Sequence, residues 1–330
     1  MKILYIDNKK YIHNADLHID FIASLEKNNF CKIIGYGNFL NKRLKTSIIP
    51  NFKNINNQID KILKIYNIDA ILTYNSGGSN YESGGDNISL YNWISDKISK
   101  INIPKFHITT DYLRCGFRQS QADWFKDLGY TAAIFRTKDS MRHSIGVRKI
   151  LLPFSVDKNI YLKNINKKEK ENKVGFIGTS NKFPEIYANR IMAMKTLRDN
   201  DLLVETKYLK TVERSQMMFG EHYVKFLTKN LFNLTCAGTC NYFTAKHFQI
   251  PAAYSMLVCT DVSGLEDFPE NTYIKYNIDN LEKLIDDIMY HIENKKITFN
   301  KIDTLHNYII NNHTNYIRGR NFIKKLETLI

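Results

Sequence analysis

Short runs of β-branched and aromatic residues alternate with longer amphipathic segments along this sequence, and the pattern occurs twice. In residues 17–27, the apolar residues Leu17, Phe21, Ile22 and Leu25 recur at the spacing of one helix face. Consecutive parallel strands need a long crossover connection, which is usually a helix. The alternation therefore predicts an α/β architecture, with parallel sheets whose two faces are covered by helices.

In the first half, strands are expected at Lys2–Ile6, Cys31–Tyr36, Ala70–Tyr74, Lys105–Thr110, Ala132–Phe135 and Lys149–Leu152. Helices are expected between them at Leu17–Lys27, Ile55–Tyr66, Ile88–Lys100, Gln119–Leu128 and Lys138–His143. Ligands of such sheets bind beyond the carboxyl ends of the strands, so functional residues are expected in the loops that follow the strands.

The second half repeats the pattern. Strands are expected at Val174–Ile177, Leu202–Thr206, Leu231–Thr235, Met256–Cys259 and Tyr273–Tyr276. Helices are expected at Pro184–Leu197, Arg214–Leu227 and Lys246–Tyr254, and along most of the chain from Leu281 to Ile330. We therefore expect an N-terminal domain over residues 1–155 and a C-terminal domain over residues 173–330. A linker is expected over residues 156–172, because its lysine-rich part mixes both charges.

The composition is that of a folded globular protein, with 43% hydrophobic and 24% charged residues. No apolar run approaches the roughly 18 residues that a spanning helix needs, and the first residues are expected to form a strand, not a signal peptide. The five cysteines are odd in number and scattered along the chain. We therefore expect buried free thiols, a cytoplasmic location, and neither a metal ion nor another cofactor.

The formal net charge of +14 has two interpretations. A basic surface attracts phosphate-bearing partners such as nucleotides, nucleic acids or anionic membranes. An abundance of Lys, Asn and Ile is also typical of proteins encoded by AT-rich genomes. The lysines here are distributed along the whole sequence and do not recur on one face of an element. Charge alone therefore does not select a class of partner.

Three positions in the second half suit the chemistry of a phosphate or a nucleoside. Gly178 follows an expected strand, where a glycine turn lets backbone N–H groups approach a phosphate; an ordinary tight turn is the alternative. Lys246 precedes an expected helix and has the charge to neutralise a departing diphosphate, unless it is a surface lysine. The carboxylate of Glu266 either accepts both ribose hydroxyls or stabilises a helix N-terminus.

The sequence around these positions resembles a known family. Residues 151–157 (LLPFSVD), 174–179 (VGFIGT), 246–253 (KHFQIPAA) and 263–268 (SGLEDF) are similar to motifs of the CgeB-like glycosyltransferases, relatives of glycosyltransferase family four. The end of the chain, with His313, Thr314, Tyr316 and Arg320, is similar to the final helix of that family. The resemblance implies the GT-B fold, in which two Rossmann-like, doubly wound domains face a central cleft. It also implies that the C-terminal helices pack back towards the first domain.

The resemblance further implies an activity. This is metal-independent transfer of a hexosyl or pentosyl group from a UDP- or GDP-linked sugar to a hydroxyl acceptor, with retention of the anomeric configuration. The implied donor-binding residues are Gly178, Thr179, Lys207, Asn241, Lys246, Gln249, Gly264, Leu265 and Glu266. Lys246 would stabilise the leaving group. Two positions where the family-four pattern has glutamate are the amides Asn241 and Gln249, and Tyr254 stands where glycine is usual. These departures bear on the identity of the sugar more than on the reaction class.

Candidate residues for the acceptor side lie in the first half. Asp111 follows an expected strand, where it would act as a base or bind a sugar hydroxyl, or else cap a helix or turn. The other candidates are polar or basic side chains in or near expected loops: His13, His18, Asn75, Arg114 and Arg118. For the two histidines a structural role is the alternative.

Two other functions are compatible with the same fold. One makes DNA the acceptor, for a virus-encoded enzyme that glycosylates a hydroxylated base in the host cytoplasm, and the charge of +14 motivates it. The other is a non-catalytic protein that binds nucleotide-sugars, motivated by Asn241 and Gln249. Neither the acceptor nor the oligomeric state is indicated by the sequence.

Overall fold

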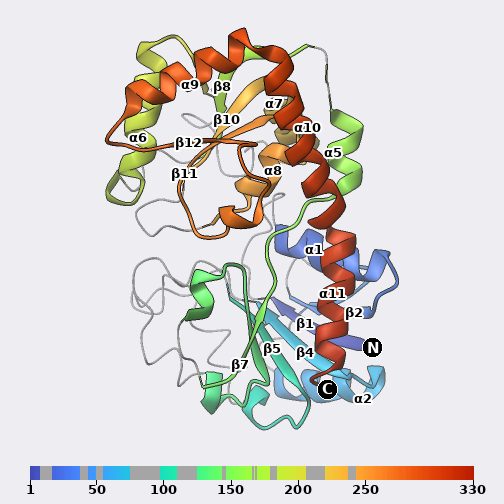
Figure 1. Ribbon diagram of the computed structural model, residues 1–330. Helices are drawn as coiled ribbons and strands as arrows, with labels where there is room; N and C mark the ends of the chain where they lie inside the picture. Colours follow the sequence, from blue (N-terminus) through green and yellow to red (C-terminus); the bar gives the residue numbers. More distant parts are fainter. Residues whose placement is uncertain are drawn as a thin grey trace. The chain divides into compact units, whose positions relative to one another are not determined.

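The computed structural model describes residues 1–7, 17–37, 44–49, 55–74, 97–109, 125–142, 146–165, 167, 169–178, 184–205, 220–236 and 243–330. The chain divides into two compact units. Unit 1 contains the described residues up to Pro153 together with Tyr316–Ile330, and unit 2 contains Phe154–Asn315. Figure 1 shows the elements of each unit in the colours of the sequence.

Unit 1 is built on a seven-stranded sheet with the order β3-β2-β1-β4-β5-β6-β7, all of whose described pairings are parallel. Its strands are β1 Lys2–Asp7, β2 Lys32–Tyr36, β3 Thr46–Ile48, β4 Ala70–Tyr74, β5 Lys105–Ile108, β6 Ala132–Phe135 and β7 Arg148–Leu151. The strand order reverses at β1, which lies between β2 and β4, as in a doubly wound sheet.

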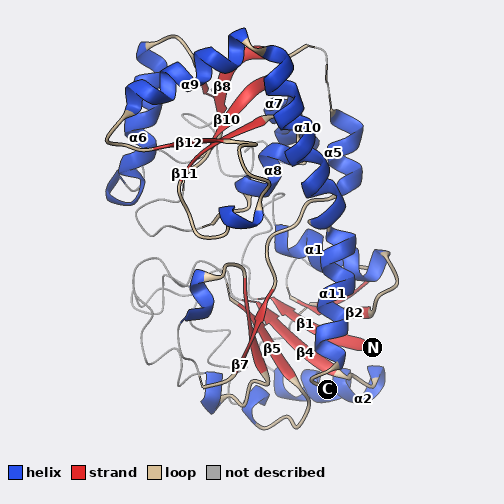
Figure 2. Ribbon diagram, in the orientation of Figure 1, coloured by secondary structure: helices blue, strands red, loops and turns tan. Residues whose placement is uncertain are grey.

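Helices cover both faces of this sheet (Figure 2). They include α1 Leu17–Lys27, α2 Ile55–Tyr66, the short 3-10 helix η3 Asp139–Arg142 and α11 Asn315–Glu327. On one face, α1 and α11 bury apolar side chains against β1 and β4, among them Phe21, Leu25 and Phe322. Ile59 and Ile62 of α2 pack against the other face of the sheet. The last helix therefore completes the core of the first unit.

Unit 2 contains a five-stranded parallel sheet with the order β12-β11-β10-β8-β9. Its strands are β8 Glu171–Phe176, β9 Leu203–Glu205, β10 Asn230–Leu234, β11 Met256–Thr260 and β12 Ile274–Tyr276. Its helices are α5 Lys158–Asn164, α6 Pro184–Asp199, α7 Glu221–Lys229, α8 Lys246–Ala252, η6 Leu265–Asp267, α9 Leu281–Glu293 and α10 Lys295–Asn312.

The segments that enter and leave unit 2 are hydrogen-bonded to each other. Val156 N donates to His313 O at 3.0 Å, and Asn315 N donates to Val156 O at 2.9 Å. The Ser155 hydroxyl donates to Asn315 Oδ1 at 2.6 Å, and both side chains are buried. The two passages of the chain between the units are thereby fixed side by side at this point.

The α/β class with two parallel sheets is confirmed, and most expected elements lie within one or two residues of the observed ones. Three of the described elements were not expected. β3 and η6 have only three residues each, and α5 lies inside the segment expected to be a linker. α5 forms because the Asp157 side chain caps its first turn and Tyr161 is buried, so this part of the segment is packed. Of the C-terminal helices, α11 alone belongs to unit 1, whereas α9 and α10 belong to unit 2.

Several expectations lie wholly or partly outside the described residues. Most of the helices expected at Ile88–Lys100 and Gln119–Leu128 fall there, as does the start of the one expected at Arg214–Leu227. Lys138–His143 contains η3 instead of an α-helix. Cys31, Cys236 and Cys259 are free and buried, as expected, whereas Cys115 and Cys240 are outside the described part. Among the helices that the structure describes, none combines the length and apolarity needed to traverse a bilayer.

Candidate functional site

The site begins where β8 ends, at the first turn of α8. Lys246 is the first residue of α8, and its ammonium group donates to the backbone oxygen of Ile177. The same Nζ lies 5.1 Å from the centroid of the Phe176 ring. A Cβ atom at position 178 would lie 2.6 Å from Nζ, so Gly178 provides the space that the ammonium group occupies. The structure therefore brings together two of the residues that the sequence indicated.

A second cation, Arg190 of α6, lies at the same place. Its side chain is buried, and its guanidinium carbon lies 5.2 Å from the Phe176 ring centroid and 4.0 Å from the Tyr187 ring centroid. Arg190 Nε donates to Cys236 Sγ at 3.2 Å, just after β10. Two cations thus lie around one aromatic ring, which attracts positive charge through its π face. Sequence analysis missed Arg190, because a single arginine within a helical pattern carries no distinguishing signal.

The charge of Lys246 is destabilised by this environment. Burial and, to a smaller extent, the nearby Arg190 lower its pKa from the usual 10.5 to about 7, while Cys236 opposes the shift. A bound anion would favour the charged form of the lysine, since an opposite charge within a few ångströms raises a depressed lysine pKa. The two cations therefore form a candidate site for an anion.

Tyr276 at the end of β12 adds a polar group near this cluster. Its side chain is 4% exposed, and its hydroxyl has no hydrogen-bond partner among the described residues. Burial raises the pKa of this tyrosine and Arg190 lowers it. Tyr276 also lines a pocket of about 400 Å³ at the carboxyl ends of β11 and β12, with Asn189, Thr260, Asp261, Lys275, Asn277 and Ile278. A hydroxyl left unpaired in a protein interior is costly, which is typical of groups that serve a ligand.

The turn at Gly264 is coupled to α8 through one aromatic side chain. Gly264 has φ +111°, and a Cβ atom there would lie 3.2 Å from the Phe243 ring. Phe243 stacks in turn on His247, the residue after Lys246, with 4.6 Å between ring centroids. The Glu266 carboxylate accepts a hydrogen bond from Gly264 N. This contact stabilises the turn at the start of η6, and Leu265 is buried. Ribose binding by Glu266 stays a prediction.

Gln249 is placed differently from Lys246. It is buried on α8, and its Oε1 accepts a hydrogen bond of 3.1 Å from the Tyr223 hydroxyl of α7. The buried Tyr161 of α5 lies near Gln249, which moderates the upward shift of the Tyr161 pKa that burial causes. The structure therefore groups Gln249 with α5 and α7 and not with Lys246 and Arg190.

The remaining candidates are not described. Thr179, Lys207 and Asn241 of the donor set lie outside the described residues, as do Asp111, His13, Asn75, Arg114 and Arg118 of the acceptor set. His18 lies in α1, but its side chain is outside the described part. Their roles stay predictions from sequence.

No family model matches the sequence, and no curated protein matches it. Solved structures match over nearly the whole chain. Anabaena Alr3699/HepE in complex with UDP-glucose has a TM-score of 0.69 at 11% identity, covering 99% of this chain and 100% of that one. A glycosyltransferase from Rickettsia africae has a TM-score of 0.68 at 11% identity, covering 99% and 98%. The chain has the GT-B fold.

This fold is shared beyond proteins described as glycosyltransferases. The N-terminal domain of a Candida albicans trehalose-6-phosphate phosphatase matches with a TM-score of 0.63 at 11% identity, covering 99% of this chain and 97% of that one. The expected fold is confirmed by these matches. The more specific resemblance to CgeB-like enzymes stays a prediction.

Proposed function

We propose that this protein is a glycosyltransferase that uses a nucleoside diphosphate sugar, and that unit 2 binds the donor. The observation that carries the proposal is the convergence of Lys246 and Arg190 on one ring, Phe176, beside the Gly178 turn at the end of β8. The GT-B fold supports it, because Alr3699/HepE, which shares the fold, has been solved with UDP-glucose. A diphosphate is an anion that two such cations suit.

The same cations would serve the chemical step. Glycosyl transfer breaks the bond between the anomeric carbon and a phosphate oxygen, so negative charge grows on the departing diphosphate. Preorganised positive groups in a site shielded from water stabilise such charge more strongly than water does. We assign this role to Lys246 and Arg190. Retention of configuration and independence from a metal ion belong to the proposal through the family resemblance.

Release of the nucleoside diphosphate from a panel of UDP- and GDP-sugars tests this function, because glycosyltransferases slowly transfer sugar to water. We expect release from at least one donor, and a decrease of about tenfold or more in Lys246→Ala, since an interaction of a charged group with the transition state is worth at least about 1.4 kcal/mol. Lys283→Ala is the matched control, because Lys283 of α9 is an exposed lysine of the same unit that does not line the candidate site, and its ion pair with Asp287 spans 2.7 Å.

Two results would count against the proposal. No release from any donor, together with saturable binding of the same nucleotides, would make the protein a non-catalytic nucleotide-binding protein. Equal loss of activity in Lys246→Ala and Lys283→Ala would show that the Lys246 cluster has no special role.

A further inference from the structure

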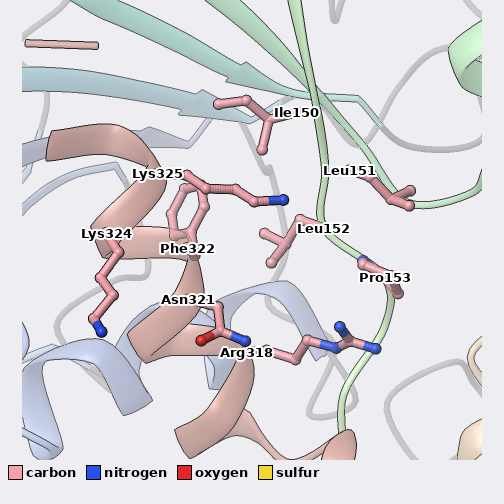
Figure 3. A pocket seen from close by; sticks show the side chains of 9 residues that line it. All are labelled: Ile150, Leu151, Leu152, Pro153, Arg318, Asn321, Phe322, Lys324 and Lys325. Atoms are coloured by element: carbon pink, nitrogen blue, oxygen red, sulfur yellow. The ribbon is translucent and has the colours of Figure 1, made fainter. Parts of the chain in front are cut away.

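Unit 1 has a pocket at the edge of its sheet, far in sequence from the candidate donor site. It has a volume of about 270 Å³ and lies between the end of β7 and one face of α11 (Figure 3). The strand side contributes Ile150, Leu151, Leu152 and Pro153, and the helix contributes Arg318, Asn321, Phe322, Lys324 and Lys325. None of these residues belongs to the site proposed above.

The position of the pocket follows from the fold. β7 is the edge strand of the sheet, and α11 is held beside it because Phe322 enters the core of unit 1. Residues 318, 321, 322 and 325 recur every three or four positions, so they lie on one face of α11. Ile150, Leu152 and Phe322, each at most 5% exposed, form an apolar floor. The floor keeps water away from one side of any group bound there.

The polar groups around this floor are cationic or neutral. In Figure 3 the Arg318 and Lys325 side chains extend from α11 towards the strand, on either side of Leu152, with Asn321 between them, whereas Lys324 extends away. From the interior, buried Arg136 donates through Nη1 to the Leu152 backbone oxygen at 3.2 Å. All nine lining residues are within the described part of the chain, and none of them is acidic.

We propose that this pocket binds the phosphate monoester group of a small molecule. A phosphate monoester carries close to two negative charges at neutral pH and presents three acceptor oxygens. Arg318 offers a planar pair of donors, Lys325 a compact charge, and the Asn321 amide a neutral donor, which together match those oxygens. The volume suits a compact ligand, because it is slightly below that of pockets that hold drug-sized molecules.

The test is calorimetric titration of the full chain with glycerol 3-phosphate. We expect saturable binding, and a weakening of about tenfold or more in each of Arg318→Gln and Lys325→Gln, since each loses a charge-assisted hydrogen bond. Arg320→Gln is the matched control, because Arg320 is exposed on the same helix and does not line the pocket, and it should bind as the wild type does. Lys246→Ala should also bind normally, which separates this pocket from the anion site of unit 2.

Vesicles that contain phosphatidic acid present the same phosphate monoester as a lipid headgroup. Binding of glycerol 3-phosphate supports a soluble ligand, and binding of the vesicles alone supports a lipid, provided that the Arg318 and Lys325 variants weaken it. The proposal is overturned if neither probe binds, or if Arg320→Gln weakens binding as much as the other two variants. A thermal melt of each variant identifies any loss of binding that comes from unfolding.

Discussion

The ammonium group of Lys246 is poised to change its protonation state when an anion binds. Burial and the neighbouring Arg190 lower its pKa to about 7, so at pH 8 most molecules of the free protein carry a neutral Lys246. A bound diphosphate favours the charged lysine and raises its pKa again. Binding above pH 7 is therefore linked to uptake of a proton.

We predict uptake of about one proton when UDP binds at pH 8, because the terminal phosphate, with a second pKa of about 6, is already ionised there. Calorimetry in buffers with different enthalpies of ionisation measures this uptake. Lys246→Arg is the matched variant, since its guanidinium stays charged at this pH and should bind UDP without taking up a proton. Equal uptake by the two proteins would show that another group titrates.

Tyr254 combines an unfavourable backbone with favourable packing. Its φ of +58° lies in the left-handed region, which costs a residue with a side chain about 1–2 kcal/mol. Its ring is 3% exposed and lies under Lys167, whose Nζ is 4.4 Å from the ring centroid. The family resemblance indicated that a tyrosine is unusual at this position, because glycine is usual there in the resembled family.

Replacement of Tyr254 tests which effect is larger. Loss of a buried aromatic ring costs about 3–5 kcal/mol, which exceeds the backbone strain that glycine would relieve. We therefore predict that Tyr254→Gly lowers the free energy of unfolding by about 2 kcal/mol, measured by urea denaturation. Tyr254→Phe keeps the ring and should lose less than half as much. A glycine variant as stable as the wild type would mean that the packing contributes little.

Some residues of the candidate site could be identified from the sequence, and others could not. Gly178 and Lys246 were identified because each stands at the boundary of a predictable element. Arg190 and Tyr276 were not, because they reach the site from the middle of α6 and the end of β12, and only the folded sheet brings these elements together. Gln249 was assigned to the donor through the family resemblance, and this assignment stays a prediction. Its buried hydrogen bond to Tyr223 depends on α7, which a motif within α8 does not reveal.

At the scale of elements, most strands and helices were predictable because buried parallel strands are short and apolar, and their crossover helices are amphipathic. α1, α2, β4 and β6 were expected with the bounds that the structure shows. α5 escaped prediction because its surroundings are rich in lysine, and a helix of seven residues depends on its cap and its packing more than on its composition.

The stability of α5 should therefore depend on its cap. Asp157 Oδ1 accepts a hydrogen bond of 2.9 Å from Asn159 N at the first turn. We predict that Asp157→Ala lowers the free energy of unfolding by about 1 kcal/mol in urea denaturation, the usual loss for an N-cap. Asp286→Ala, at an exposed position of α9, is the control and should stay within about 0.5 kcal/mol of the wild type. Equal losses of stability in Asp157→Ala and Asp286→Ala would show that the loss of the cap is not the cause.

At the scale of the whole molecule, the chain returns to unit 1 with its last helix. Phe322 of α11 is 1% exposed, and its ring centroid lies 5.9 Å from that of Phe21 in α1. Gly319 permits this close packing, because a Cβ atom there would lie 2.8 Å from a methyl group of Leu25. The packing of α1 in unit 1 thus depends on residues more than 290 positions away in the sequence.

We predict that Phe322→Ala destabilises unit 1 by about 3–5 kcal/mol, the usual cost of removing a buried phenylalanine from a core. Urea denaturation, followed together with limited proteolysis of unit 1, measures the effect. Arg320→Ala, exposed on the same helix, should change stability by less than about 0.5 kcal/mol. A small effect of Phe322→Ala would mean that α11 is dispensable for this core.

The central claim is that unit 2 binds the diphosphate of a nucleotide through Lys246 and Arg190, and calorimetric titration with UDP and GDP tests it most directly. We predict saturable binding of at least one of the two, weakened about tenfold or more by Lys246→Ala and by Arg190→Gln, but unchanged by Lys283→Ala. The absence of binding by both nucleotides, or binding that survives in both the Lys246 and the Arg190 variants, would contradict the account.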